Sequence, residues 1–246
     1  MAARTGEFRV ALADGRVRDE AEGGQPEAAS EAEETTGDEA GAKPEAETAK
    51  PPKSYRMITP TDWFRVPLRS EEKRLKSVRA LVDHAYPNRD EFATKRHELR
   101  DLLTNVMNTA AERGAIEIYL STHATLGVPI PASLLVTAEP EDPSLPGPMP
   151  AELLADGLRS KHKNDADVSI VKLLSGEAVR CRRQELSEDS KELGQPQERP
   201  NTLLEFYLPV PNSTAWLVLT FSAPLPELAD AQVQMFDAIA GSFRWS

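Results

Sequence analysis

The sequence predicts an α+β fold: an antiparallel sheet of about six to eight strands flanked by helices, preceded by a disordered acidic N-terminal tail. Three observations support this prediction. Composition changes sharply near residue 54. Two β-rich runs, at 202–210 and 215–222, are separated by a short turn and followed by an amphipathic segment, the pattern of a hairpin covered by a helix. The other strand-like runs adjoin one another, and helical runs are grouped between them rather than alternating with them.

Residues 1–54 form the predicted tail, and residues 55–246 form the predicted domain. Between Asp19 and Lys50 there are eleven acidic and two basic residues, and no aromatic residue occurs from Arg9 to Ser54. Such a segment buries too little apolar surface to offset its chain entropy, so we predict that it is disordered. Its thirteen acids and seven bases give −6, which leaves −5 of the chain's net charge of −11 for the domain.

One short pattern near the start of the chain departs from the rest of the tail. Phe8, Val10 and Leu12 alternate ahead of Asp14-Gly15, a dipeptide typical of hairpin turns. An isolated two-stranded hairpin is only marginally stable in water. Two interpretations stay open: a strand that docks on the domain, or an unstructured terminus.

The domain is predicted to begin with two short strands and a helix. The strands, at 55–60 and 63–67, are separated by a Pro-Thr-Asp turn. Ser70 precedes two glutamates, so we expect it to cap the N-terminus of a helix. Apolar residues then recur at helical spacing, namely Leu75, Val78, Leu81 and Val82.

A second and longer helix is predicted to begin after the cap residue Asn88 and to end at Gly114. Its apolar residues share one stripe over nearly seven turns. A coiled-coil seam would show the same spacing, but the stripe lasts only about three heptads and leads directly into a strand. We therefore predict that this helix packs on the sheet through Phe92, Leu99, Leu102, Leu103, Val106 and Ala110.

The remaining segments complete the sheet. Alternation of apolar and polar residues predicts two neighbouring strands, followed by a rigid loop with five prolines, a short helix and a hairpin. A polar segment, which we predict to be mobile, leads to the last two strands. The two strands are residues 115–121 and 130–138, the loop is 140–150 and the short helix is 150–158. The hairpin is 168–174 with 177–185, and the polar segment is 186–201.

Three segments resemble PsbP-like domains, in particular their actinobacterial members. They are YRMITPTDWFRVPL (55–68), VKLLSGEAVRCRR (171–183) and FDAIAGSFRW (236–245). The resemblance covers about residues 55–245. It implies an antiparallel sheet sandwiched by helices, which usually serves as a binding or assembly module without a catalytic site, and it transfers no individual functional residue. The lipoprotein members carry a signal peptide and a lipid-accepting cysteine, and this sequence shows neither.

The sequence matches no catalytic or metal-binding template. His97-Glu98 fails the zinc-protease pattern, because Asp101 stands where the second histidine should be. Ser70 and Lys73 match part of a lactamase-type motif, but a helix cap explains the serine. We therefore predict no metal, no cofactor and no enzymatic activity. His84 and His97 fall in predicted helices, whereas His123 and His162 fall in or beside loops.

The predicted strand 177–185 carries the single cysteine and the densest basic cluster of the domain. Strand alternation places Val179 and Cys181 on one face, and Arg180 and Arg182 on the other. We interpret Cys181 as a core thiol; an accessible thiol flanked by arginines would instead have a lowered pKa and be reactive. Arg180, Arg182 and Arg183 are the predicted binding residues, for an anion or an acidic partner such as the chain's own tail. Alternatively, they form a solvated strand face paired with nearby glutamates.

These patterns favour a cytoplasmic, non-catalytic module that binds another protein. The net charge of −11 disfavours nucleic-acid binding, and no apolar run is long enough to span a membrane. Two alternatives stay open. One is a small-ligand carrier or enzyme that uses a cleft between sheet and helices, with Arg180, Arg182 or a loop histidine as its polar anchor. The other is an accessory component of a bacterial secretion system.

Overall fold

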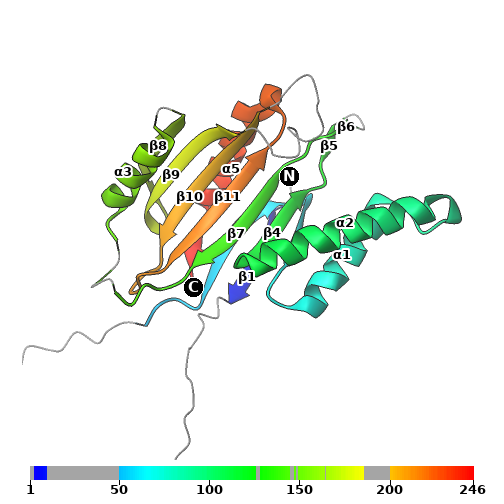
Figure 1. Cartoon of the computed structure of the whole chain (residues 1–246), viewed down its shortest axis with the longest axis horizontal. Helices are drawn as coiled ribbons and strands as arrows, with labels where there is room; N and C mark the ends of the chain where they lie inside the picture. The colour runs from blue at the N-terminus through cyan, green and yellow to red at the C-terminus, as the bar shows by residue number, and fades with distance from the viewer. Residues whose placement is uncertain are drawn as a thin grey trace, which may run out of the picture.

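A seven-stranded antiparallel sheet forms the centre of the molecule (Figure 1). The computed structural model describes residues 3–9 by their backbone, together with residues 50–125, 128–144, 147, 149–163, 165–185 and 200–246. Each pair of neighbouring strands runs antiparallel, so the predicted α+β class is confirmed. In sheet order the strands are β3 (Trp63–Pro67), β4 (Ala115–Ser121), β7 (Ser133–Glu139), β11 (Trp216–Ala223), β10 (Asn201–Pro209), β9 (Gly176–Glu185) and β8 (Ala166–Leu173).

A second sheet of three strands has β2 (Ser54–Pro60) at its centre, between β1 (Ala3–Arg9) and β12 (Arg244–Trp245). The last helix, which the amphipathic segment after residue 222 predicts, ends at Gly241, because Phe243 turns inward and stacks on Tyr55 with ring centroids 5.2 Å apart. The chain end then pairs with β2, which adds a strand that the sequence did not predict.

The N-terminal strand β1 pairs with β2 over its whole length, so that Phe8 lies opposite Tyr55. This pairing corresponds to the interpretation in which an early strand docks on the domain. Val10 and Leu12 lie outside the described residues. So does the segment 10–49, on which the prediction of disorder falls, and so do residues 186–199, which we predicted to be mobile.

The helices cover the two faces of the large sheet differently (Figure 1). On one face, α5 packs together with β2 over a core that includes Ala178. On the other face, α3 covers Val179 and Cys181 at one end, and the α1–α2 pair covers β3 and β4 at the other. The helices are α1 (Glu71–Ala85), α2 (Ala93–Glu112), α3 (Ala151–His162) and α5 (Ala229–Gly241), and short 3-10 turns η1 (Asp90–Phe92) and η2 (Pro226–Leu228) precede α2 and α5. None of the described helices has the length and apolar character needed to cross a membrane.

The α5 face holds the aromatic core. Phe236 stacks on Phe221 with ring centroids 4.8 Å apart, and Phe221 in turn meets Phe206 edge to face at 6.1 Å. Such pairs add about 1 kcal/mol each beyond the area they bury. In the amphipathic segment, the apolar residues that recur at helical spacing are all buried: Val233, Phe236, Ile239 and Ala240 on α5, and Phe243 just after it.

Helix α2 departs most from the prediction. It begins at Ala93 after η1 rather than directly after Asn88, and its N-terminus lacks a side-chain cap. Leu103 and Ala110 do pack toward the sheet, but Leu102 is 59% exposed and Val106 is 47% exposed. The helix leans on α1, and its N-terminal part projects beyond the sheet (Figure 1). Helical spacing correctly grouped these residues on one side, but no described element covers the outer part of that side.

Several local predictions are confirmed. Ser70 caps α1, because its Oγ accepts a hydrogen bond from the Lys73 backbone N–H at 3.4 Å. Gly114 follows α2 with a φ of 84°, a conformation that glycine adopts without strain. The turn between β8 and β9 lies at Leu174-Ser175, one residue earlier than predicted.

Candidate functional site

Two of the predicted binding residues, Arg180 and Arg182, lie on β9 and face α5. The Arg180 guanidinium donates to both carboxylate oxygens of Asp237, at 2.8 and 3.2 Å, and it lies 3.4 Å from Asp167. Arg182 donates to Asp230 at 2.6 Å. The hydrogen bonds to Asp237 raise the pKa of Arg180. These ion pairs tie α5 to β9, so an external anion would compete with carboxylates of α5 for the same guanidinium groups.

The third predicted residue, Arg183, lies on the opposite face of β9. Its guanidinium pairs with the buried carboxylate of Glu205 and lies 3.4 Å from Glu185. Glu205 also accepts a hydrogen bond from the Tyr207 hydroxyl at 3.1 Å. Burial, together with the charge of Glu205, raises the pKa of Tyr207. The fold therefore divides the three arginines between two faces, and anion binding by them stays a prediction.

Cys181 is fully buried beneath α3, next to Ala155 and Leu158. Burial raises the pKa of its thiol. The thiol is therefore protonated at neutral pH and is a poor nucleophile. The interpretation of Cys181 as a core residue is confirmed.

Sequence reasoning missed a buried carboxylate on the α5 face. Glu117 on β4 is only 4% exposed; it pairs with Arg65 of β3 and accepts a hydrogen bond from the Tyr119 hydroxyl at 2.9 Å. Burial and the nearby Glu117 raise the pKa values of Tyr55 and Tyr119. The signal available in the sequence was the alternation of Ala115–Ser121, which puts Glu117 and Tyr119 on one side of a strand.

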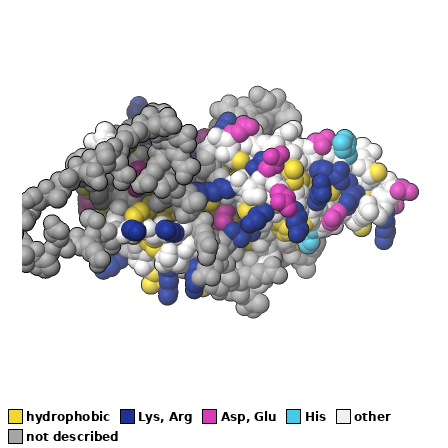
Figure 2. Space-filling view, turned by 90° about the horizontal axis from the view of Figure 1, so that it is seen from below, with side chains coloured by type: hydrophobic (Ala, Val, Ile, Leu, Met, Phe, Trp, Pro, Cys, Tyr) yellow, Lys and Arg dark blue, Asp and Glu magenta, His cyan; other side chains and the backbone are white. Residues whose placement is uncertain are grey.

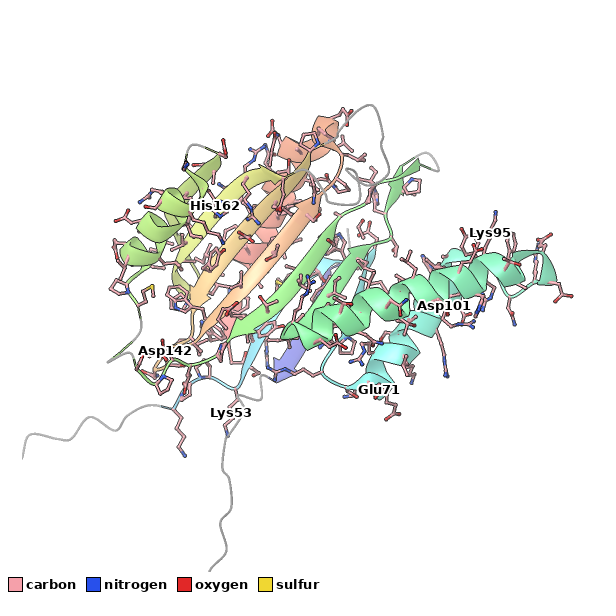
Figure 3. All side chains as sticks on the ribbon, viewed as in Figure 1. Lys53, Glu71, Lys95, Asp101, Asp142 and His162 are labelled. Carbon is pink, nitrogen blue, oxygen red and sulfur yellow. The ribbon has the colours of Figure 1, made fainter. Side chains whose placement is uncertain are left out.

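The four histidines do not gather in one place. His97 is exposed on α2 and lies 3.4 Å from Asp101, and His162 lies at the end of α3 (Figure 3). His123 follows β4, and its Nδ1 lies 2.7 Å from the Asp62 carboxylate. Among the described residues, no three His, Cys, Asp or Glu side chains are grouped so as to hold a metal ion.

His123 and Asp62 border an apolar pocket of about 240 Å³ between the large sheet and α5. Trp63 and Ile130 form the sheet side of the pocket, and Met235 lies on the helix side. The ring of Trp63 meets Phe236 edge to face at 6.1 Å, so the pocket is continuous with the aromatic core. Of the residues singled out from the sequence, His123 is the one that the fold places at the edge of this apolar pocket.

No protein-family model matches this chain, and no curated protein matches it. Among solved structures, the chain is similar to the solution structure of cyanobacterial PsbP (CyanoP) from Synechocystis sp. PCC 6803. The TM-score is 0.37 with 11% sequence identity, over 78% of this chain and 86% of that one.

A crystal structure of a protein from Bacteroides thetaiotaomicron VPI-5482 is also similar. Its TM-score is 0.38 with 9% sequence identity, over 78% of this chain and 45% of that one. This chain therefore spans less than half the length of that protein. Both TM-scores lie below 0.5, so neither similarity supports an argument about the fold or the function of this chain.

Proposed function

We propose that this protein is a non-catalytic protein-binding module of the bacterial cytoplasm, and that its partner docks on the exposed face of α2. The observation that carries the proposal is an apolar stripe turned toward solvent. Leu99, Leu102 and Val106 are spaced by three and four residues, so they lie on one side of the helix. Leu102 and Val106 are exposed by about half or more. An amphipathic helix of another protein fits such a stripe.

The helical hairpin that presents this stripe is braced by two arginines. Near its base, Arg74 of α1 donates to Asn108 of α2 at 2.9 Å and to the Leu68 carbonyl oxygen at 2.6 Å. Near its tip, Arg96 of α2 donates to the Tyr86 carbonyl oxygen and to the Asp83 carboxylate, both at the end of α1. A surface held in place before binding loses less conformational entropy when a partner docks.

The charge of the hairpin indicates the character of the partner. Residues 69–113 contain ten basic and eight acidic residues, a net charge of +2 in a chain of −11. Figure 2 shows Lys and Arg side chains over this half of the molecule, interspersed with Asp and Glu side chains and with apolar ones. Lys95 projects from α2 near the tip of the hairpin (Figure 3). We therefore expect an acidic partner helix, which a basic surface attracts and orients.

Affinity capture from a bacterial lysate tests the proposal with three proteins. The wild type is compared with a double variant, Leu102→Ser with Val106→Thr, and with Leu153→Ser as a matched control, because Leu153 is 61% exposed on α3. We expect a partner that the wild type and the control enrich equally and that the double variant enriches at least about tenfold less. Equal enrichment by all three proteins would place the interface elsewhere. A second form of the test puts a photo-crosslinking residue at position 102 or 153, and only position 102 should link the partner.

The pocket beside α5 favours a second function, that of a small-ligand carrier. A concave apolar site with a few polar groups at its edge is the usual form of a ligand site, and this pocket combines both features around the pair formed by His123 and Asp62. The two functions use different parts of the molecule, so each is tested separately.

A further inference from the structure

The pocket is formed where three segments far apart in the sequence meet: the turn between β2 and β3, the chain between β4 and β7, and α5. Its walls are mostly apolar. Its volume of about 240 Å³ exceeds the roughly 150 Å³ apolar cavity that holds benzene in an engineered protein. The space therefore suits a molecule somewhat larger than one six-membered ring, and it is too small for most drug-sized ligands.

The walls of the pocket are held by contacts that do not depend on a ligand. Trp63 rests edge to face on Phe236, which itself stacks on Phe221. On the helix side, Gln232 of α5 donates from Nε2 to the Pro131 carbonyl oxygen at 3.0 Å and so joins α5 to the chain before β7. A site that is already formed does not lose binding energy to ordering its walls.

The polar edge of the pocket is fixed by a set of hydrogen bonds. The Asp62 carbonyl oxygen accepts from both the backbone N–H and the hydroxyl of Thr122, at 2.8 and 2.7 Å. The neighbouring His123 places Nδ1 2.7 Å from the Asp62 carboxylate, and its carbonyl oxygen accepts from Ile130 N–H at 2.9 Å. The imidazole is therefore held at a defined place on the rim, where it can face a polar group of a bound molecule.

We infer that this pocket binds a small aromatic molecule of one or two fused rings that carries a polar N–H or O–H group at the rim formed by Asp62 and His123. Two residues with flat rings, Trp63 and His123, line the space, and Met235 supplies a thioether, which contacts aromatic rings favourably. The inference rests on the second proposed function and names the ligand class for it.

Methyl NMR of the intact protein labelled with ¹³C-methyl methionine tests the inference, with indole as the probe. Met235 lines the pocket, whereas Met107 lies in the separate core beneath α1 and α2 and serves as an internal reference. We expect indole to shift the Met235 methyl signal with a dissociation constant below about 1 mM and to leave the Met107 signal in place. 1-Methylindole lacks the N–H and should bind at least about threefold more weakly, because it loses the hydrogen bond at the rim. Equal affinity for the two compounds would overturn the polar part of the inference.

A matched pair of variants checks the location. Ala231→Phe adds a ring at an exposed residue of α5 that borders the pocket, and Ala238→Phe adds the same ring two turns along the same helix, also at an exposed residue. We expect Ala231→Phe to weaken indole binding at least tenfold and Ala238→Phe to leave it unchanged, with the melting temperatures of both variants reported alongside. Equal effects of the two variants would overturn the assignment to this pocket.

n-Hexanol separates failure of the ligand class from failure of the carrier function. If n-hexanol shifts the Met235 signal and indole does not, the aromatic class is wrong and the pocket still takes an apolar ligand. If neither compound shifts Met235 at 10 mM, a concentration about tenfold above the expected limit, both the ligand class and the carrier function are wrong.

Discussion

Each face of the large sheet has a buried glutamate that contacts one tyrosine and one arginine, and the two sites differ in the residues that surround them. Both places use a Glu-x-Tyr segment on one strand and an arginine on the neighbouring strand. On the α5 face they are Glu117 with Tyr119 and Arg65, and on the α3 face they are Glu205 with Tyr207 and Arg183.

The two clusters differ in what surrounds the charges. Glu117 lies beneath β2, close to Tyr55, and Arg65 is 38% exposed. Arg183 is more buried, but it keeps a second carboxylate, that of Glu185, 3.4 Å away. The Glu205 cluster therefore has a reserve partner for its arginine. In the Glu117 cluster, by contrast, the carboxylate also accepts from a hydroxyl that is itself buried, because Tyr119 is only 3% exposed.

The largest expected difference comes from removing each carboxylate in turn. Glu117→Ala should lower the free energy of unfolding by about 3 kcal/mol, because it leaves a buried hydroxyl and a guanidinium without their shared acceptor. Glu205→Ala should cost about half as much, because Glu185 still faces Arg183. Urea denaturation of both variants measures the two costs. The comparison fails if Glu205→Ala is the more damaging change.

A double substitution sharpens the first result. Glu117→Leu alone removes the carboxylate that pairs with Arg65, whereas Glu117→Leu combined with Arg65→Met replaces the whole pair by apolar groups. We expect the double variant to be at least about 1 kcal/mol more stable than Glu117→Leu alone, because a buried ion pair contributes little beyond compensating its own desolvation. Additive losses in a double-mutant cycle would show that the two residues do not act as a pair.

The tyrosines of both clusters predict a fall in stability at alkaline pH. Their pKa values are raised in the folded protein, whereas a tyrosine in the unfolded chain has a pKa of about 10. Above about pH 10 the unfolded chain loses protons that the folded protein keeps, so the free energy of unfolding decreases as pH rises, by up to about 1.4 kcal/mol per pH unit for each tyrosine. Below that pH the contribution is constant.

Above about pH 10, Tyr119→Phe should therefore make the free energy of unfolding decrease less steeply with pH, by the contribution of one tyrosine. The matched control is Tyr86→Phe, at the end of α1, far from either carboxylate cluster. Urea titrations at several values between pH 8 and pH 11 measure the slope. The same decrease in both variants would mean that Tyr119 is not specifically protected from ionisation.

The smallest effect is expected at the edge of the α5 face. Arg182 pairs with Asp230, which is 84% exposed, so Arg182→Gln should change the free energy of unfolding by no more than about 0.5 kcal/mol. Arg180→Gln should cost about 1 kcal/mol, because the bidentate pair with Asp237 is more buried. Thermal unfolding distinguishes the two. A cost above about 2 kcal/mol for Arg182→Gln would mean that this pair supports α5 more than its exposure indicates.

Much of the strand arrangement could be predicted because alternation along a strand fixes which residues share a face. The placement of Cys181 inward and of Arg180 and Arg182 on the opposite face followed from this rule alone. The buried stripe of α5 followed in the same way from helical spacing. The rule was insufficient for α2, because spacing groups Leu102 and Val106 on one side without saying whether another element covers that side.

The candidate sites were less accessible to sequence reasoning. His123 could be singled out as a loop histidine, but Asp62 lies some 60 residues earlier in the sequence and Met235 more than 100 residues later, and only the folded chain brings them to one pocket. The two carboxylate clusters could not be predicted from the sequence either, because each includes an arginine from a neighbouring strand. Register between strands, which no single segment encodes, decides those pairs.

The amino-acid sequence alone determined the class of fold, the order of its elements and the inward or outward direction of most strand residues, because these depend on local periodicity and composition. Tertiary structure decided which apolar faces stay uncovered, which carboxylates pair with the arginines and where a pocket forms beside α5. Those features arise from contacts between segments distant in sequence, and their energies depend on burial that exists only once the whole sheet and its helices have assembled.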